Sequence, residues 1–107
     1  MNIDIDEIFR IYEKEQFNKM FASTSNKYKK LLNEYNKMLE TLVAVNAEKD
    51  LLNSITAAYN QASSEFEKFK KDPDYDYDNR RFKVVQFALQ QSKKRYFHYL
   101  EKIAING

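Results

Sequence analysis

Glycine and proline are almost absent from this chain. Its single Gly is the last residue, and its single Pro is at position 73. These residues form most of the tight turns that join β-strands, and no stretch of the sequence alternates apolar and polar residues for long, as a half-buried strand does. We therefore expect an all-α fold. With 107 residues, 43% of them hydrophobic, the chain is long enough to bury a core as a single helical domain covering residues 1–107.

Apolar spacing and turn residues predict three helices. The first covers residues 4–21, where apolar side chains recur three and four residues apart and early acidic residues suit the positive end of a helix dipole. Residues 22–26, which are rich in Ser, Thr and Asn, then interrupt the pattern. A long central helix is expected over 27–71, and after Pro73 a last helix over 79–105. The expected shape is an elongated, coiled-coil-like bundle.

The central segment leaves two geometries open. One heptad position is apolar throughout, but its companion position is apolar only in the first half. Residues placed at 100° intervals put the apolar stripe of 28–45 roughly 145° from that of 52–69. Either one helix is continuous and its halves face different neighbours, or it breaks near 46–50, so that a four-helix bundle closes around one core. We favour the continuous helix, because Ala47, Glu48 and Lys49 are good helix formers. Segments 4–21 and 79–105 would then fold back over its two halves.

The chain contains few side chains that are suited to catalysis. It has no Cys, which excludes disulfides, thiolate metal sites and thiol nucleophiles. His98 is the only side chain with an ordinary pKa near neutrality, and Ser92, six residues earlier, lies on a different helix face. Phosphate-binding Gly-rich loops are excluded by the lack of an internal Gly. We therefore expect no enzyme activity, no catalytic residues, no cofactor and no small-molecule substrate.

Alternating acidic residues around Pro73 suggest a calcium loop at first sight. Asp72, Asp74, Asp76 and Asp78 have the spacing at which carboxylates converge on one ion. The other ligand positions do not fit, since a loop starting at Asp74 would have neither the required Gly at its sixth position nor the Glu at its twelfth. We expect a solvated linker and no metal site.

Protein–protein association is the function that this architecture favours. Two helices that pack only on each other cannot enclose many aromatic side chains, so the uncovered side of an elongated layer needs a partner or a second copy. We expect a non-catalytic assembly or adaptor protein. Large apolar residues on the heptad seams are the expected interface: Tyr28, Tyr35, Met38, Leu42, Tyr59, Phe66, Tyr96 and Tyr99.

Nucleic-acid binding is the alternative function. Residues 79–107 contain seven basic residues and one acidic residue, whereas the whole chain has a net charge of only +2. A helix face rich in Lys and Arg can follow a phosphate backbone. Under this alternative the contact residues are Arg80, Arg81, Lys83, Lys93, Lys94 and Arg95.

No membrane segment is expected. The longest purely apolar run has four residues, at 42–45, against the roughly 20 that cross a bilayer. We therefore expect a cytoplasmic protein. The abundance of Lys, Asn, Tyr and Ile is typical of an AT-rich genome, such as that of a low-GC bacterium or its phage, in which case a virion location is an alternative.

Overall fold

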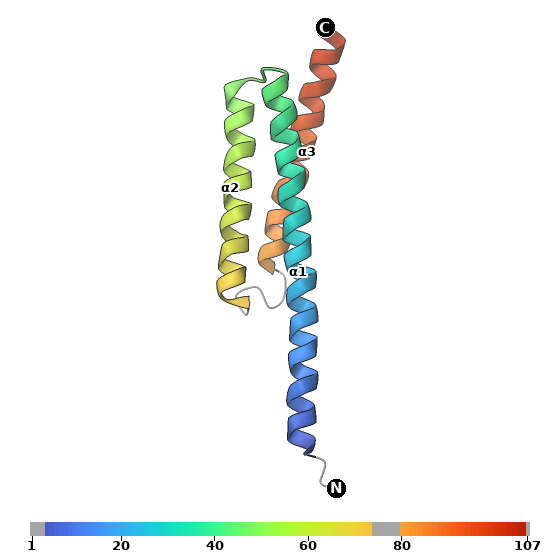
Figure 1. The fold of residues 1–107 in the computed structure, drawn as a ribbon. Coiled ribbons are helices and arrows are strands. Elements are labelled where there is room, and N and C mark those ends of the chain that lie inside the picture. The colour runs from blue at the N-terminus through green and yellow to red at the C-terminus, as the bar shows by residue number, and fades with distance from the viewer. Residues whose placement is uncertain (1–3, 74–79, 107) are drawn as a thin grey trace.

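The computed structural model describes residues 4–73 and 80–106, and these residues form three α-helices with no β-strand among them. The helices are α1 (Ile5–Ala44), α2 (Lys49–Lys71) and α3 (Arg80–Asn106). The molecule is elongated, with principal extents of 77 × 19 × 19 Å (Figure 1). The expected all-α class, the three helices and the elongated shape are confirmed, and the last helix lies within one residue of its expected bounds. The first two helices have different bounds.

The long helix is the first one, not the central one. α1 continues through residues 22–26, where the sequence had predicted an interruption. The packing of this segment explains why. Thr24 and Ser25 are buried on the side of α1 that faces the other helices. Phe21 before them and Tyr28 after them both stack on Phe69 of α2. Tertiary packing of these rings therefore overrides the weak helix propensity of the Ser and Thr residues. Asp4 caps the N-terminus of the helix, and its carboxylate accepts hydrogen bonds from two backbone N–H groups of the first turn.

Helix α1 ends before α2 begins, so the expectation of a continuous helix over 27–71 is wrong. The alternative, a break near 46–50, is the one that forms. α1 ends in a Schellman motif. The backbone N–H of Ala47 donates to Leu42 O at 2.9 Å, and that of Asn46 donates to Val43 O at 3.1 Å. Asn46 has φ 54°, in the left-handed region that Asn enters more easily than most residues. The prediction of a continuous helix rested on the good helix formers that follow Asn46. It did not take into account that Asn46 itself can adopt the left-handed conformation that ends a helix.

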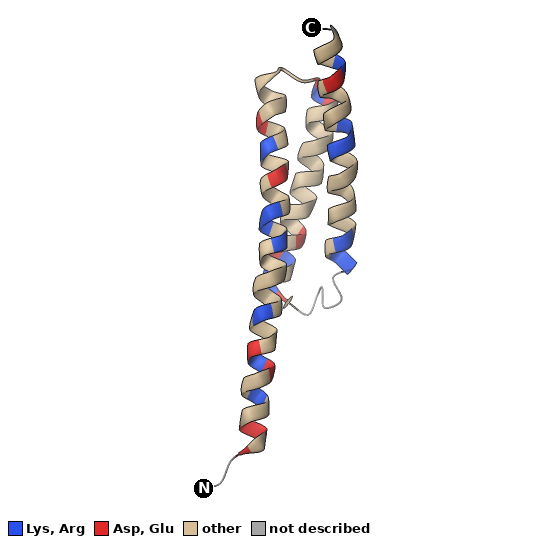
Figure 2. Cartoon of the chain, turned by 90° about the vertical axis from the view of Figure 1, so that its right-hand side faces the viewer, with Lys and Arg blue, Asp and Glu red and all other residues tan. Residues whose placement is uncertain are grey.

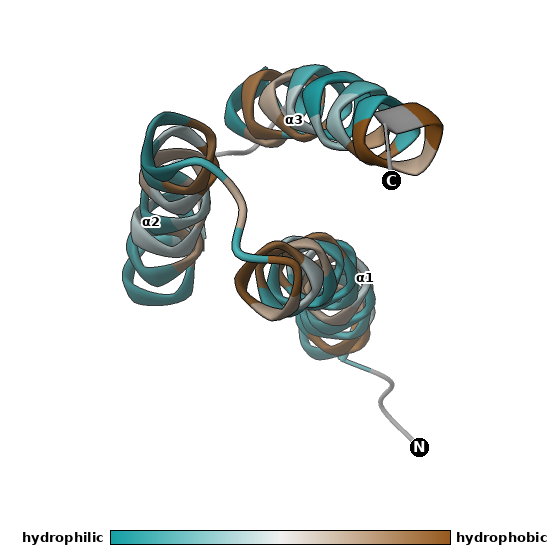
Figure 3. Cartoon of the chain, turned by 90° about the horizontal axis from the view of Figure 1, so that it is seen from above, coloured by the Kyte–Doolittle hydropathy of each residue, from teal (hydrophilic) through white to brown (hydrophobic). Residues whose placement is uncertain are grey.

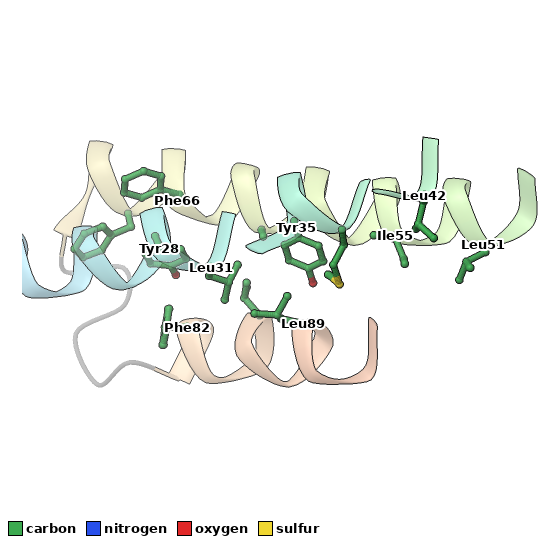
Figure 4. Packing of buried hydrophobic residues seen from close by; sticks show 13 residues of the cluster. Tyr28, Leu31, Tyr35, Leu42, Leu51, Ile55, Phe66, Phe82 and Leu89 are labelled. Carbon is green, nitrogen blue, oxygen red and sulfur yellow. The ribbon is translucent and has the colours of Figure 1, made fainter. Parts of the chain in front are cut away.

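The break brings both apolar stripes into one core. Buried side chains of all three helices form a single cluster, to which α1 contributes Tyr28 through Leu42 and α2 contributes Leu51 through Phe69 (Figure 4). Among the described residues three helices enclose this core and not four, because α1 is not interrupted at 22–26. Viewed from above, they surround it as a triangle (Figure 3). α3 is inclined to the other two helices, so its C-terminal end diverges from α2 (Figure 1).

The first part of α1 does not fold back on the rest of the chain. It continues in a straight line past the end of the bundle, where α2 ends and α3 begins (Figure 1). We call residues 5–19 the arm. At 1.5 Å per residue the arm is about 22 Å long. Every residue of the arm is exposed, and the burial of α1 increases only from Met20 onward.

Candidate protein-interaction surfaces

The arm presents bulky apolar side chains to solvent. Ile5 is 76% exposed, and the other exposed apolar side chains of the arm are Ile8, Phe9, Ile11, Tyr12 and Phe17. Four of them, at positions 5, 8, 9 and 12, are spaced three and four residues apart and therefore lie on one face of the helix. We call these four residues the arm stripe. A contiguous exposed apolar face of this kind is typical of an interaction site rather than of scattered surface residues.

The arm stripe is not a continuation of the face that α1 turns toward the core. Inside the bundle this core face repeats at intervals of seven residues, through Phe21, Tyr28, Tyr35 and Leu42. Two further steps toward the N-terminus reach Lys14 and then Glu7, which are charged. At 100° per residue, the arm stripe and the core face are centred about 140° apart. A simple extension of this bundle would therefore leave the arm stripe uncovered.

A groove with a basic rim lies between α1 and α3 and has a volume of about 390 Å³. Its floor is formed by buried apolar side chains from both helices, Leu31, Phe82 and Leu89. Exposed side chains form its rim: Lys27, Lys30, Lys83 and Gln86. The one acidic residue that lines it, Glu34, accepts a hydrogen bond from Lys93 Nζ at 2.6 Å. We call this the basic groove; three ammonium groups surround it, and its one carboxylate is already paired.

The eight residues predicted as an interface lie in or against the core of the chain itself. Five are buried there: Tyr28, Tyr35, Met38, Leu42 and Phe66. The other three are partly buried and pack against the same cluster: Tyr59, Tyr96 and Tyr99. The break at residues 45–48 accounts for this, because it lets the two apolar stripes face each other instead of opposite neighbours. The role of these residues in an interface stays a prediction, and the exposed apolar surface of the described chain is found elsewhere.

The basic residues predicted for nucleic acid are spread along α3 (Figure 2). Two of them bind other helices of the same chain: Lys93 forms the ion pair with Glu34 on α1, and the Arg95 guanidinium donates to Ser54 Oγ on α2. Lys83 lies on the rim of the basic groove, and Lys94 is exposed. Arg80 and Arg81 are exposed at the first turn of α3. The six residues therefore do not form one surface of free cations.

His98, the one side chain expected to have a pKa near neutrality, lies on the surface of α3. This side chain is exposed on α3 and lines a shallow hollow together with charged residues of α2 and α3, among them Asp50, Arg95 and Lys102. In residues 4–73 and 80–106 no group of three His, Cys, Asp or Glu side chains is placed to hold a metal ion. Asp74, Asp76 and Asp78 of the supposed calcium loop lie outside the described residues.

Burial perturbs the pKa of Tyr35. Its side chain is fully buried in the core, and this burial raises the pKa of Tyr35 above 10.0. Ser92 on α3 acts in the opposite direction and lowers the pKa of Tyr35, but the Tyr35 hydroxyl does not meet hydrogen-bond geometry with any described group. Because the side chain is fully buried in the core, we assign Tyr35 a structural role.

Sequence reasoning missed the arm stripe as a site, although it identified the apolar spacing of Ile5, Ile8, Phe9 and Tyr12. These residues were expected to pack on residues 27–45 of the same chain. The available signal was the charge at the heptad positions Glu7 and Lys14, which shows that the arm does not share the core face of the rest of α1.

No described helix is long and apolar enough to cross a membrane. Comparison with known proteins gives no match for this chain among protein-family models, curated proteins or solved structures.

Proposed function

We propose that this chain is a non-catalytic assembly or adaptor protein that acts by helix packing, and that the arm is its docking element. The observation that carries the proposal is the arm stripe. Ile5, Ile8, Phe9 and Tyr12 are more than half exposed on a helix that extends beyond the bundle. Transfer of one such side chain from water into an apolar contact is worth about 1.5–3 kcal/mol when its burial is complete. An arm that docks on a protein surface therefore has a large favourable term available.

The arm is also built to remain helical before it docks. Asp4 caps its first turn, and Asp6 and Glu7 lie near the positive end of the helix dipole. Its other end is fixed in the bundle, because Phe21 stacks on Phe69 of α2 with ring centroids 5.2 Å apart. A helix that is already formed loses little conformational entropy on binding, which favours helix-in-groove recognition.

Site-specific photo-crosslinking in the native cells tests this function. A photoreactive amino acid replaces Phe9 in the full chain, and a matched chain carries it at Asn60, an exposed position on α2. We expect light-dependent adducts of discrete mass from position 9 and none from position 60. Adducts from both positions alike, or from neither, would contradict the assignment of the arm as the docking element.

Nucleic-acid binding remains a second candidate because Lys27, Lys30 and Lys83 surround one groove. Its signature is an affinity for labelled DNA or RNA that falls steeply with salt, because each phosphate contact releases counterions. Lys83 and Lys94 are better test positions than Lys93 and Arg95, which bind other helices. A Lys83→Ala and Lys94→Ala double variant that loses at least tenfold in affinity, with a reduced salt dependence, would support this function, and unchanged binding would count against it.

A further inference from the structure

We infer that the occupant of the basic groove is the arm of a second copy of this chain. The two copies would lie antiparallel along one face of α1, and each arm would fill the groove of the other copy. This inference rests on the proposed function and specifies its partner. It is carried by the position of the groove on α1, by the direction in which the arm stripe faces and by the charges on the two parts of the helix.

One face of α1 carries both the arm stripe and the α1 side of the basic groove. The groove residues on α1 are Lys27, Lys30, Leu31 and Glu34. At 100° per residue their mean direction lies about 40° from that of the arm stripe, whereas the arm stripe and the core face are about 140° apart. Because α1 is one uninterrupted helix, the two parts face nearly the same side. A second copy in antiparallel orientation therefore contacts both the arm stripe and the groove residues of α1.

This geometry fixes the register of the contact. The arm stripe is centred near residue 9 and the groove near residue 31, so a two-fold axis close to Met20 brings each opposite the other. Phe9 then lies level with Leu31 of the second copy, at the apolar floor of the groove. Such a contact uses the same surface on both copies, so it closes as a dimer and does not propagate into a filament.

The charges of α1 are complementary in this orientation. Within the arm, Asp6, Glu7, Glu13 and Glu15 outnumber the three basic residues. Residues 27–37 contain four Lys and a single acidic residue, Glu34, which is already paired with Lys93. An antiparallel pair sets the acidic part of each helix against the basic part of the other, whereas a parallel pair would set like charges together. In the proposed register Glu13 lies level with Lys27 of the second copy.

The contact would also complete the packing of the bundle. Near the groove only three helices surround the core, and the arm of the second copy takes the fourth position, beside α1 and α3. Lys83 of α3 then approaches the acidic flank of the docked arm, which includes Glu13. Two helical arms enter two grooves, so the apolar side chains of both arm stripes leave water in one association step.

Sedimentation equilibrium of the purified full chain, from about 1 to 200 µM, is the first test. We expect a dimer of the 12.8 kDa chain. Ile8→Asp should weaken the dimer at least 100-fold, because it places a charge in the apolar contact on both copies. Ile105→Asp is the matched control; Ile105 is 84% exposed at the far end of α3 and its substitution should leave the dimer unchanged. A wild-type chain that is monomeric at 200 µM, or a dimer that tolerates Ile8→Asp, overturns the inference.

A charge exchange tests the register. Glu13→Lys and Lys27→Glu should each weaken the dimer about tenfold, because each creates two pairs of like charges in the symmetric contact. Both substitutions in one chain should restore the affinity to within about threefold of the wild type. Lys27 lies 5.9 Å from the ring centroid of Phe82, so Lys27→Glu also removes a cation–π contact, but the second substitution at Glu13 cannot replace that contact. Lack of rescue overturns the proposed register.

The two proposals can fail separately. Photo-adducts from position 9 that have twice the mass of the chain support both proposals. Adducts to a different protein, together with a monomeric purified chain, support the adaptor function and overturn the second copy as the occupant. Binding of DNA or RNA in the groove by an otherwise monomeric chain would overturn it too.

Discussion

The ring of Tyr28 on α1 stacks on the ring of Phe66 on α2, with centroids 5.2 Å apart and ring planes inclined by 14°. The same tyrosine meets the edge of Phe82 on α3, at a centroid distance of 5.1 Å. Tyr28 is thus the side chain through which all three helices contact one another at the end of the bundle nearest the arm (Figure 4). The stability of this end depends on the contact, and so does the shape of the groove floor, which includes Phe82.

Tyr28→Ala should therefore lower the free energy of unfolding by about 3–5 kcal/mol, which is the cost of removing a fully buried aromatic ring. Urea denaturation followed by circular dichroism, at one fixed protein concentration, measures the change. Phe87→Ala is the control, because Phe87 is mostly exposed on α3 and its loss should cost no more than about 1 kcal/mol. Equal effects of the two substitutions would contradict the core assigned to Tyr28.

The turn between α1 and α2 gives a second prediction. Asn46 holds a left-handed conformation that Gly adopts without strain and that a β-branched residue opposes. Asn46→Gly should raise the free energy of unfolding by about 0.5–1 kcal/mol, and Asn46→Val should lower it by about 1–2 kcal/mol. Thermal and urea unfolding of the two variants measure both changes. If the two substitutions had the same sign and size, the turn would not depend on the conformation at Asn46.

The sequence predicted the fold class, the number of helices and the last helix, because these follow from features that act locally. The lack of Gly and Pro excludes most hairpins, and Pro73 ends a helix wherever it lies in a fold. Local features predicted an interruption at 22–26 and favoured a continuous helix over a break at 46–50, but only the break near 46–50 forms. A choice between them depends on contacts between distant residues, such as Phe21 with Phe69, which no local pattern contains.

The candidate site was harder to predict for the same reason. Apolar heptad positions such as Tyr35 and Leu42 indicate that a face is buried, but they do not say whether the chain itself or a partner buries it. In the structure the chain does, because the turn at Asn46 lets α2 cover α1. The arm stripe was visible as a pattern, and only the straight course of α1 shows that it is left uncovered (Figure 1).

Glu65 gives a third prediction. This residue is buried on α2, its Oε1 lies 3.8 Å from Lys68 Nζ, and its Oε2 has no hydrogen-bond partner among the described groups. A carboxylate oxygen that loses its water without gaining a donor is costly. Glu65→Met, which keeps the length of the side chain, should raise the free energy of unfolding by about 1–2 kcal/mol. Glu67→Met is the control, because Glu67 is an exposed partner of Lys70 and should change the stability by less than about 1 kcal/mol. A destabilised Glu65→Met variant would show that the carboxylate is better solvated than its burial indicates.

The buried hydroxyl of Tyr35 gives a fourth prediction, which concerns the free energy of unfolding at alkaline pH. Burial raises the pKa of Tyr35 in the folded chain above the 10.0 of an exposed tyrosine, so above that pH the unfolded chain loses this proton while the folded chain keeps it. Proton release on unfolding makes the free energy of unfolding decrease as pH rises, by at most about 1.4 kcal/mol per pH unit for one group. The contribution of Tyr35 is therefore fully present below pH 10.0 and is lost as the pH approaches the raised value.

Tyr35→Phe removes this group and keeps the ring. At pH 7 the variant should be as stable as the wild type or about 1 kcal/mol more stable, because the lost hydroxyl has no hydrogen-bond partner. Above pH 10.0 its advantage should grow with pH, since only the wild type still contains the titrating group. Urea unfolding at several pH values measures this difference, and Tyr12→Phe, a substitution at an exposed tyrosine, should show no such growth. Parallel pH profiles for the wild type and Tyr35→Phe would mean that water reaches the hydroxyl in the folded chain.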